Sequence, residues 1–230
     1  MSSGDTGRSR ASLTAIADWV TISSLATAGG TLVLAVATFG AVRSSNRSAR
    51  IAEAALHEQR RPILSHSRLD DPLQKIGFAD GHWVRVEGGH AAAEHVDGRV
   101  YLAMSLRNVG AGIAVLYGWS VWHEQRVGRL PHREPEEFRM TTRDLLIPPN
   151  DVGLWQGAIR DRDDDDHGQL ARNIDARNNF AVDLMYGDSA GERWISRFGI
   201  TAVAEDQWLC SVVRHWNLDG ADFRERADES

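Results

Sequence analysis

Apolar and polar residues alternate over most of the chain beyond residue 62, with the period of two that is typical of β-strands. Val100, Leu102, Met104 and Leu106 alternate with smaller or polar neighbours, which predicts a strand with one buried face. The same pattern recurs in eight further segments: Arg61 to Leu69, His82 to Glu87, Ile113 to Val121, Phe138 to Ile147, Gly153 to Arg160, Asn179 to Tyr186, Arg193 to Val203 and Gln207 to Trp216.

Seven to nine short strands joined by turns predict a mainly β fold, an antiparallel immunoglobulin-like β-sandwich over residues 62–218. Pro148-Pro149-Asn150-Asp151 is a turn signal between two of these strands. Only Gln169 to Arg177 has a helical pattern, which is short. A segment of roughly 155 residues is long enough to bury a core. Residues 219–230 are polar, and we expect a frayed tail there.

A different pattern occupies residues 19–42. These 24 residues carry no charge, and Trp19 lies at their outer edge. As a helix they would span roughly 36 Å, enough to cross a hydrocarbon core of about 30 Å. The segment, which includes Gly30, Leu34 and Phe39, is therefore predicted to be a transmembrane helix preceded by a disordered N-terminus, residues 1–18.

A buried core helix and a cleaved signal peptide are the two alternatives for this segment. A core helix of such length rarely lacks a charged residue on one face. Arg8 and Arg10 could form the basic region of a signal peptide, and Ala35-Val36-Ala37 could form its cleavage site. The apolar run is longer than a typical signal core, however, and basic residues follow it closely, so a membrane anchor is favoured.

The flanking charges predict the orientation of the anchor. Arg43, Arg47 and Arg50 follow it closely, whereas Arg8 and Arg10 precede it at a distance. The positive-inside rule then predicts a single-pass protein of the cell membrane, with its N-terminus outside and its C-terminal domain in the cytoplasm.

The helical pattern continues over residues 43–61 as a juxtamembrane spacer, and Pro62 ends it. Its arginines can contact anionic headgroups, which makes the lipid bilayer the first predicted partner. Within the span, small residues at 23, 27, 30, 37 and 41 share one face, interrupted by Leu34. A homodimer through the transmembrane helix is therefore a hypothesis, against the alternative that small residues are merely common in such segments.

Charge and composition divide the chain in the same place. The formal net charge of -6 separates into +3 over residues 1–61 and -9 over residues 62–230. The acidic domain argues against a nucleic-acid partner and should keep this part off anionic lipid. With 42% hydrophobic residues the chain is too apolar to be disordered as a whole. The single cysteine, Cys210, cannot form an intrachain disulfide.

One motif resembles a catalytic site. The segment Gly187-Asp188-Ser189-Ala190-Gly191 fits the G-x-S-x-G pattern of serine hydrolases, which requires a strand, a sharp turn and then a helix. Here a strand-like alternation follows the motif, no HGGG-like segment supplies oxyanion donors, and His215 is the only histidine downstream. A hairpin turn explains the same residues without chemistry, so no catalytic residue is predicted.

The candidate metal motifs are also incomplete. His90 to His95, His57-Glu58 and His123-Glu124 each depart from a zinc motif, and the glycines and alanines around His90 suggest an exposed loop. The aspartates at 161, 163 and 165 resemble the start of a calcium loop, but Asp166 and Arg172 occupy the positions of its glycine and glutamate. A solvated acidic loop is expected, and neither a metal nor a cofactor is predicted.

The tryptophans leave one binding hypothesis open. Trp119 and Trp122 point to opposite faces of one strand, so at least one of them is exposed unless both faces are covered. We expect the other tryptophans of the domain to fill its core. If two or three of them shared a surface, a platform for a peptide or a sugar would be plausible.

Several segments together carry a resemblance. They are the N-terminal span, Ser44-Ser45-Asn46-Arg47 through Glu58-Gln59-Arg60-Arg61-Pro62, Leu106-Arg107-Asn108-Val109-Gly110, Leu146-Ile147-Pro148-Pro149 and Val182-Asp183-Leu184-Met185-Tyr186-Gly187-Asp188. The chain resembles a bacterial group of uncharacterised single-pass membrane proteins, frequent in actinobacteria. The resemblance implies a juxtamembrane helix followed by a β-sandwich, and it transfers no activity to any residue.

These observations predict a membrane-anchored interaction or scaffolding protein that presents a non-catalytic β-sandwich to an unknown protein partner in the cytoplasm. The alternative is the same domain facing outward as an envelope ligand-binding module. A membrane-tethered serine hydrolase using Ser189 is the third hypothesis.

Overall fold

The structure is a computed structural model that describes residues 29–32, 34–53, 55, 60–123, 130–204 and 207–219, apart from the side chains of residues 142–144 and 204. The chain divides into two units, Met1–His57 and Glu58–Ser230, which are considered separately. The predicted disordered N-terminus, residues 1–18, lies outside the described residues, and so does the predicted tail beyond Asp219.

The first unit is helical over residues 29–32 and 34–53, and its described side chains are exposed. The predicted anchor and flank residues on this helix are Gly30, Leu34, Phe39, Arg43, Arg47 and Arg50, whereas Trp19 lies outside the described residues. Residues 43–53 and 55 of the predicted spacer are thus helical. Among the described residues, no helix is both long and apolar enough to cross a membrane. The predicted transmembrane helix therefore has no support from them, and its residues 19–28 lie outside them.

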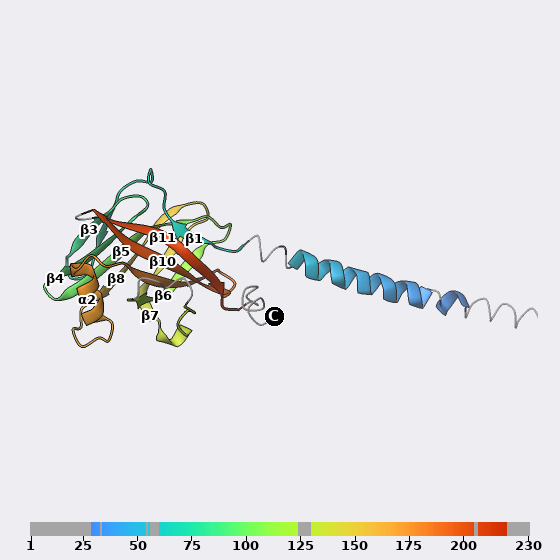
Figure 1. The fold of residues 1–230 in the computed structure, drawn as a ribbon. Helices are drawn as coiled ribbons and strands as arrows, with labels where there is room; N and C mark the ends of the chain where they lie inside the picture. Colours follow the sequence, from blue (N-terminus) through green and yellow to red (C-terminus); the bar gives the residue numbers. More distant parts are fainter. Residues whose placement is uncertain are drawn as a thin grey trace, which may run out of the picture. The chain divides into compact units, whose positions relative to one another are not determined.

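The second unit is built from strands, one α-helix and a short 3-10 helix (Figure 1). The strands are β1 (Leu64–His66), β2 (Gln74–Gly77), β3 (Trp83–Val86), β4 (His90–Val96), β5 (Arg99–Asn108), β6 (Ala114–Trp122), β7 (Arg139–Ile147), β8 (Val152–Ile159), β9 (Phe180–Gly187), β10 (Arg193–Ala204) and β11 (Gln207–Asn217). The helices are η2 (Pro135–Glu137) and α2 (His167–Asp175). The mainly β prediction is confirmed, and each of the nine predicted strands overlaps an observed one.

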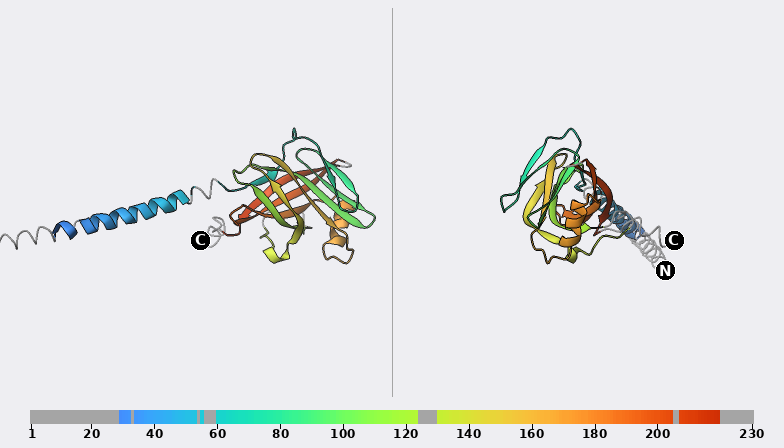
Figure 2. Two further views of the ribbon diagram at one scale, coloured as in Figure 1. Left: turned by 180° about the vertical axis from the view of Figure 1, so that it is seen from behind. Right: turned by 60° about the vertical axis from the view of Figure 1, so that its left-hand side comes forward.

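Nine of the strands form one antiparallel sheet, in the order β1-β5-β4-β11-β10-β9-β6-β7, with β8 paired to β5. β8 runs along one edge of β5 from Val100 to Arg107, so β1 and β4 share the opposite edge. The two ends of the sheet are therefore β7 and β8. The sheet curls around a common core, which α2 covers at one end (Figure 2).

The predicted immunoglobulin-like sandwich differs from this arrangement, because the main sheet is continuous instead of being split into two. The long strands β10 and β11 bend with the sheet. Their pairing contains register shifts, and one shift lies between Arg197 and Phe198. A separate hairpin, β2–β3, lies over the outside of the sheet. Its buried residues Ile76, Phe78, Val84 and Val86 pack with Tyr101 and Ala103 of β5.

The region around His90 is a strand and not the exposed loop that the sequence suggested. In β4, Ala91 and Ala93 face the core, where their small side chains leave room for Trp208, Phe180 and Met104. β4 pairs with β5 along its whole length. The alanines are therefore a packing requirement of the sheet, not a sign of irregular structure.

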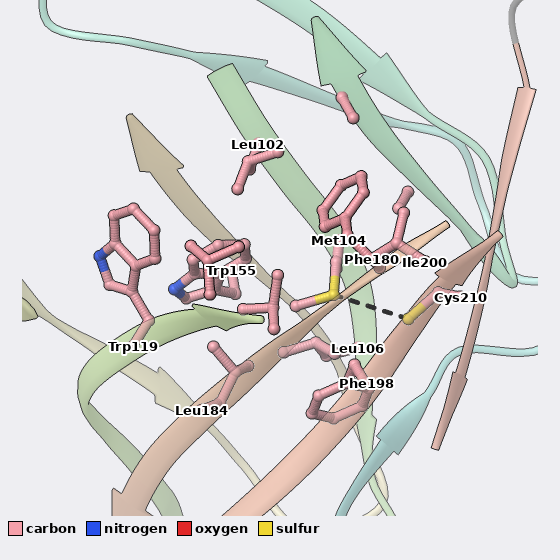
Figure 3. Packing of buried hydrophobic residues seen from close by; sticks show 14 of the residues in the cluster. Leu102, Met104, Leu106, Trp119, Trp155, Phe180, Leu184, Phe198, Ile200 and Cys210 are labelled. Carbon is pink, nitrogen blue, oxygen red and sulfur yellow. Dashed lines mark hydrogen bonds between the residues drawn. The ribbon is translucent and has the colours of Figure 1, made fainter. Parts of the chain in front are cut away.

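The core inside the curl is dominated by large aromatic and aliphatic side chains (Figure 3). The rings of Trp119 and Trp155 pack edge to face, with 5.3 Å between their centroids. Cys210 Sγ lies 3.6 Å from Met104 Sδ. Burial raises the pKa of the Cys210 thiol well above its usual range. The prediction that the tryptophans other than Trp119 and Trp122 are buried is confirmed for those at 155, 194, 208 and 216. It is wrong for Trp83, which is 58% exposed, and Trp119 is buried as well.

Candidate functional site at the seam between β7 and β8

The two ends of the curled sheet meet at a seam. β7 and β8 are consecutive strands joined by residues 148–151, yet β7 pairs with β6 and β8 pairs with β5. Among the described residues, no backbone pairing links β7 to β8. The sheet is thus open along this line, and each of the two strands has one edge without a neighbour there.

The hydrogen bonds at the start of β8 show which of its backbone groups face the seam. The Asn108 N–H donates to the Asp151 carbonyl at 3.1 Å, and the Asn150 N–H donates to the Asn108 carbonyl at 2.8 Å. Asn108 thus faces two residues, Asn150 and Asp151, which is a bulge, and Asn150 has a φ of 60° there. The N–H and C=O groups of Asn108 therefore point toward β8.

In an antiparallel pair of strands, the backbone groups of every second residue point toward the partner strand. On β8 the residues whose N–H and C=O groups point toward β5 are therefore Gly153, Trp155 and Gly157. The N–H and C=O groups of Leu154, Gln156 and Ala158 then point away from β5, into the seam. None of the hydrogen bonds between described residues uses these groups. The backbone donors and acceptors along the seam edge of β8 therefore lack a partner within the part of the chain that the structure describes.

A pocket of about 620 Å³ lies in the seam. This volume falls within the range of about 300–1,000 Å³ that is usual for ligand sites. The hairpin turn, β6, β7 and β8 all contribute to its lining, which consists of Gly77, Phe78, Ala79, Trp119, Arg139, Met140, Thr141, Leu145, Gln156, Gly157, Ala158 and Arg160.

Gly157 allows the aromatic wall of the pocket to form. A Cβ atom at this position would lie 2.7 Å from Cζ2 of Trp155 and 2.9 Å from Cε2 of Trp119, so only glycine leaves room for both indoles. The Arg139 guanidinium lies over the Trp119 ring, 5.2 Å from its centroid. The wall therefore combines an aromatic surface with a cation.

β7 leaves its regular pairing beside the pocket. The register with β6 jumps from Leu116 opposite Leu145 to Gly118 opposite Met140. The Thr141 hydroxyl lies 3.1 Å from the carbonyl oxygens of both Leu116 and Tyr117, which share its single hydrogen at this irregularity. Bulges of this kind are frequent next to binding sites, and this one leaves Met140 62% exposed at the seam.

Ion pairs border the pocket at two places. Near the hairpin turn, Asp80 accepts hydrogen bonds from the Tyr101 hydroxyl at 2.8 Å and from Arg160 Nε at 3.0 Å. The Tyr101 hydroxyl, followed by Arg160, lowers the pKa of Asp80 to about 2. This pairing fixes the hairpin turn against the end of β8.

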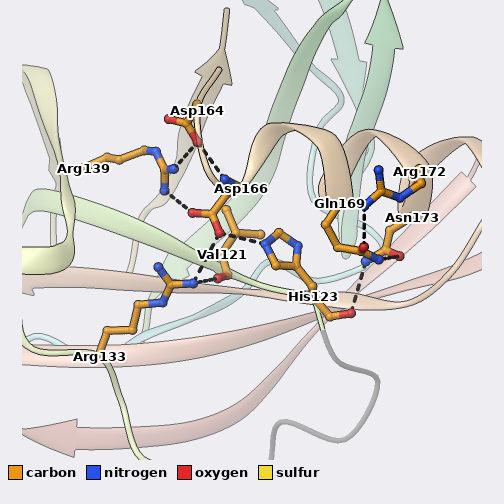
Figure 4. A network of polar contacts seen from close by, with 9 residues as sticks. All are labelled: Val121, His123, Arg133, Arg139, Asp164, Asp166, Gln169, Arg172 and Asn173. Carbon is orange, nitrogen blue, oxygen red and sulfur yellow. Dashed lines mark hydrogen bonds and ion pairs between the residues drawn. The ribbon is translucent and has the colours of Figure 1, made fainter. Parts of the chain in front are cut away.

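On the β7 side, Arg139 bridges two aspartates, 2.6 Å from Asp164 and 2.7 Å from Asp166 (Figure 4). Asp166 also accepts a hydrogen bond from His123 Nε2 at 2.7 Å and pairs with Arg133 at 3.4 Å. Although burial alone would raise the pKa of Asp166, the hydrogen bonds from His123 and Arg139 hold it well below its usual range.

The predicted solvated acidic loop is therefore solvated only in part. The side chains at 161, 163 and 165 are exposed, whereas Asp164 and Asp166 are engaged with Arg139. Within the described part of the chain, no cluster of three or more histidine, cysteine, aspartate or glutamate side chains could hold a metal.

The structure does not bring the hydrolase candidates together. Ser189 is exposed in the turn between β9 and β10, where Asp188 Oδ1 accepts the backbone N–H groups of Ala190 and Glu192. A strand follows this turn, as the sequence indicated. His215 instead lies 2.6 Å from the hydroxyl of Ser196, which is fully buried.

The tryptophans do not form a shared exposed platform. Of the described tryptophans only Trp83 is exposed, at 58%. Trp122 is covered by two guanidinium groups, with Arg197 at 4.5 Å and Arg133 at 5.4 Å from its ring centroid.

Sequence reasoning missed the seam residues Met140, Gln156 and Gly157. The signal that was present is the glycine at 157 in an otherwise regular alternation, since an isolated glycine in a strand often marks a close approach. Comparison with protein-family models, with curated proteins and with solved structures gives no match to this chain. The resemblance to bacterial single-pass membrane proteins therefore stays a prediction.

Proposed function

We propose that this chain is a membrane-anchored interaction protein whose β domain binds a partner protein at the seam between β7 and β8. The observation that carries the proposal is the seam itself, a pocket of about 620 Å³ beside a strand edge whose backbone groups have no partner among the described residues. Exposed strand edges of this kind are templates for binding another chain.

The anchor is proposed from the sequence. Residues 19–42 carry no charge, and arginines at 43, 47 and 50 follow them, which favours a cytoplasmic domain. The helical residues also expose large apolar side chains, among them Leu34, Val36 and Phe39, each at 66–69%. Exposed apolar side chains in a row need a lipid or protein cover.

Site-specific photo-crosslinking in living cells tests the binding site. A benzophenone amino acid at Met140 should form adducts with a protein, whereas the same group at Val213, exposed on β11, should not. Gln156→Trp places an indole across the pocket and should abolish the adduct. Equal adducts at both positions, or adducts at Met140 that contain only lipid, would contradict the proposal.

A reporter fused after Ser230 tests the orientation. Activity of a reporter that works only in the cytosol is the expected result. Activity of one that works only outside the membrane would instead identify an outward-facing envelope module, with the same seam as its binding site.

A further inference from the structure

We infer that the bound partner contributes an extended strand that pairs with the free edge of β8 and inserts an apolar side chain beside Trp119. This inference rests on the proposed function, and it specifies the kind of partner segment and its mode of binding.

The backbone of β8 is the first argument. Leu154, Gln156 and Ala158 present N–H and C=O groups to the seam at every second residue, the spacing that an added strand requires. Folded proteins usually protect such edges with charged residues or proline. β8 has the sequence VGLWQGAI, with neither a charge nor a proline, so its edge is unprotected.

The size of the pocket is the second argument. A strand rises about 3.3 Å per residue and occupies roughly 4.8 Å by 10 Å in cross-section, which gives about 160 Å³ per residue. The pocket of about 620 Å³ therefore holds about four residues of one strand. This space borders Gln156 to Ala158, at the end of the seam away from the turn, where Gly153 packs against Ile147. A short extended segment is therefore the occupant that the volume favours.

The side chains around the pocket are the third argument. Because neighbours on a strand point to opposite faces, every second side chain of the segment would face the wall formed by Trp119, Leu145 and Gly157. This wall favours an aromatic or long aliphatic side chain. The two charged lining residues, Arg139 and Arg160, are already paired with aspartates, so the selectivity of the pocket rests on its apolar wall and on the edge of β8.

Selection from a displayed library of random linear peptides on the full-length chain in detergent tests the inference. We expect the retained peptides to share an apolar residue with extended, alternating neighbours and to be lost on Gln156→Trp. Gln156→Pro removes one edge N–H that β5 does not use, and it should weaken binding about ten-fold. Leu73→Pro, an exposed site outside the pocket lining, is the matched control and should leave binding unchanged.

Amide hydrogen exchange of the wild-type chain gives a readout that does not depend on whether Gln156→Pro folds. Addition of a selected peptide should protect the amides of Gln156 and Ala158, which line the pocket, from exchange. Peptides that bind and are lost on Gln156→Trp, but leave these amides unprotected, would overturn strand addition while the proposed binding site stands.

Three other results would contradict the partner strand or the proposed function. If these amides are already protected in the free chain and lose protection when residues 220–230 are removed, the occupant is the chain's own tail. Protection that rises with protein concentration would identify a second copy instead. Either result overturns the inferred partner strand. If no peptide is retained and the crosslinks at Met140 contain no protein, the proposed function itself fails.

Discussion

Arg197 and Asp183 form an ion pair that is completely enclosed in the described part of the molecule. Both side chains have no exposed surface, and two hydrogen bonds of 2.7 Å join them. The guanidinium lies between the rings of Trp122 and Trp216, at 4.5 and 4.8 Å from their centroids. It also donates to the carbonyl oxygens of residues 130 and 131, and so fastens the segment before β7 to the sheet.

Arg197→Met should therefore destabilise the fold by about 3–5 kcal/mol, because it removes the positive charge that pairs with the buried Asp183 and leaves it only the hydrogen bond from the Trp122 indole. Arg193→Met removes an exposed pair with Asp219 and should cost about 1 kcal/mol or less. Urea unfolding at neutral pH measures both. Equal losses of unfolding free energy in the two variants would show that the buried ion pair stabilises the fold no more than the exposed one.

Tyr101→Phe should raise the pKa of Asp80 from about 2 toward its usual value near 3.8, because the hydroxyl that stabilises the carboxylate is lost. Since the folded pKa lies below the unfolded one, this carboxylate stabilises the fold above about pH 4, and the contribution is lost as the pH falls toward 2. The variant should therefore lose less stability on acidification across this window. NMR titration of the carboxyl carbons measures the shift, with Asp219 as an internal control that should not move.

At this scale the sequence supports some residue roles and not others. The buried tryptophans follow from their size and hydrophobicity, and a turn at Asn108 follows from the glycines at 110 and 112. In the structure the Asn108 side chain donates to Gly112 and Ile147 and accepts from Ile63 and Gly110. The enclosure of Arg197 could not be predicted, because its partners come from β6, β9 and β11 and meet only through the sheet register.

Among the elements, α2 shows how a short amphipathic pattern becomes structure. The helix was expected over Gln169 to Arg177 and is observed two residues earlier, over His167–Asp175. Leu170, Ala171 and Ile174 pack into the main core, while Arg172 is exposed. Its contribution to stability should therefore come from one face.

Leu170→Ala should cost about 2–5 kcal/mol, because the side chain is fully buried and its removal leaves a cavity. Arg172→Ala, on the exposed face, should change stability by about 0.5 kcal/mol or less. Thermal and urea unfolding compare the two. A small effect of Leu170→Ala would mean that the helix is not part of the cooperative core.

Strands with large apolar residues were predictable, and strands without them were not. β4 and β2 escaped prediction, since β4 buries only alanines and β2 contributes a single buried residue, Ile76. Their strand conformation is imposed by neighbours, because β4 lies between β5 and β11 and β2 pairs with β3. The β propensity of a segment predicts its conformation poorly where contacts with neighbouring strands determine it.

For the molecule as a whole, the seam could not be predicted from the sequence. The turn at residues 148–151 lies between two predicted strands, and consecutive strands usually pair with each other. Here they pair with β6 and β5 instead, because the curl of the sheet decides which strands become its ends. Gly157 and the bulge in β7 can be interpreted as parts of a site only once it is known that β7 and β8 are the two ends of the sheet.

The division of the chain into two units leads to a prediction for the whole molecule. The domain of strands has its own core, and the boundary at Glu58 separates it from the helical residues. A chain comprising residues 58–230 should therefore unfold cooperatively at the same temperature as the domain in the full-length protein. Circular dichroism of both chains in the same detergent measures this, and a markedly lower midpoint would mean that the helical part stabilises the domain.

The same truncation tests the proposed anchor. The full-length chain should remain with membranes during alkaline carbonate extraction, because residues 19–42 offer an uncharged segment long enough to span the hydrocarbon core. The truncated chain should be released, since its acidic surface has little affinity for anionic lipid. A full-length variant with Leu34→Arg and Phe39→Arg adds two charges to the middle of the segment and should also be released. Retention of this variant would show that the membrane is held by another part of the chain, and release of the unmodified protein would overturn the anchor while leaving the seam as a binding site.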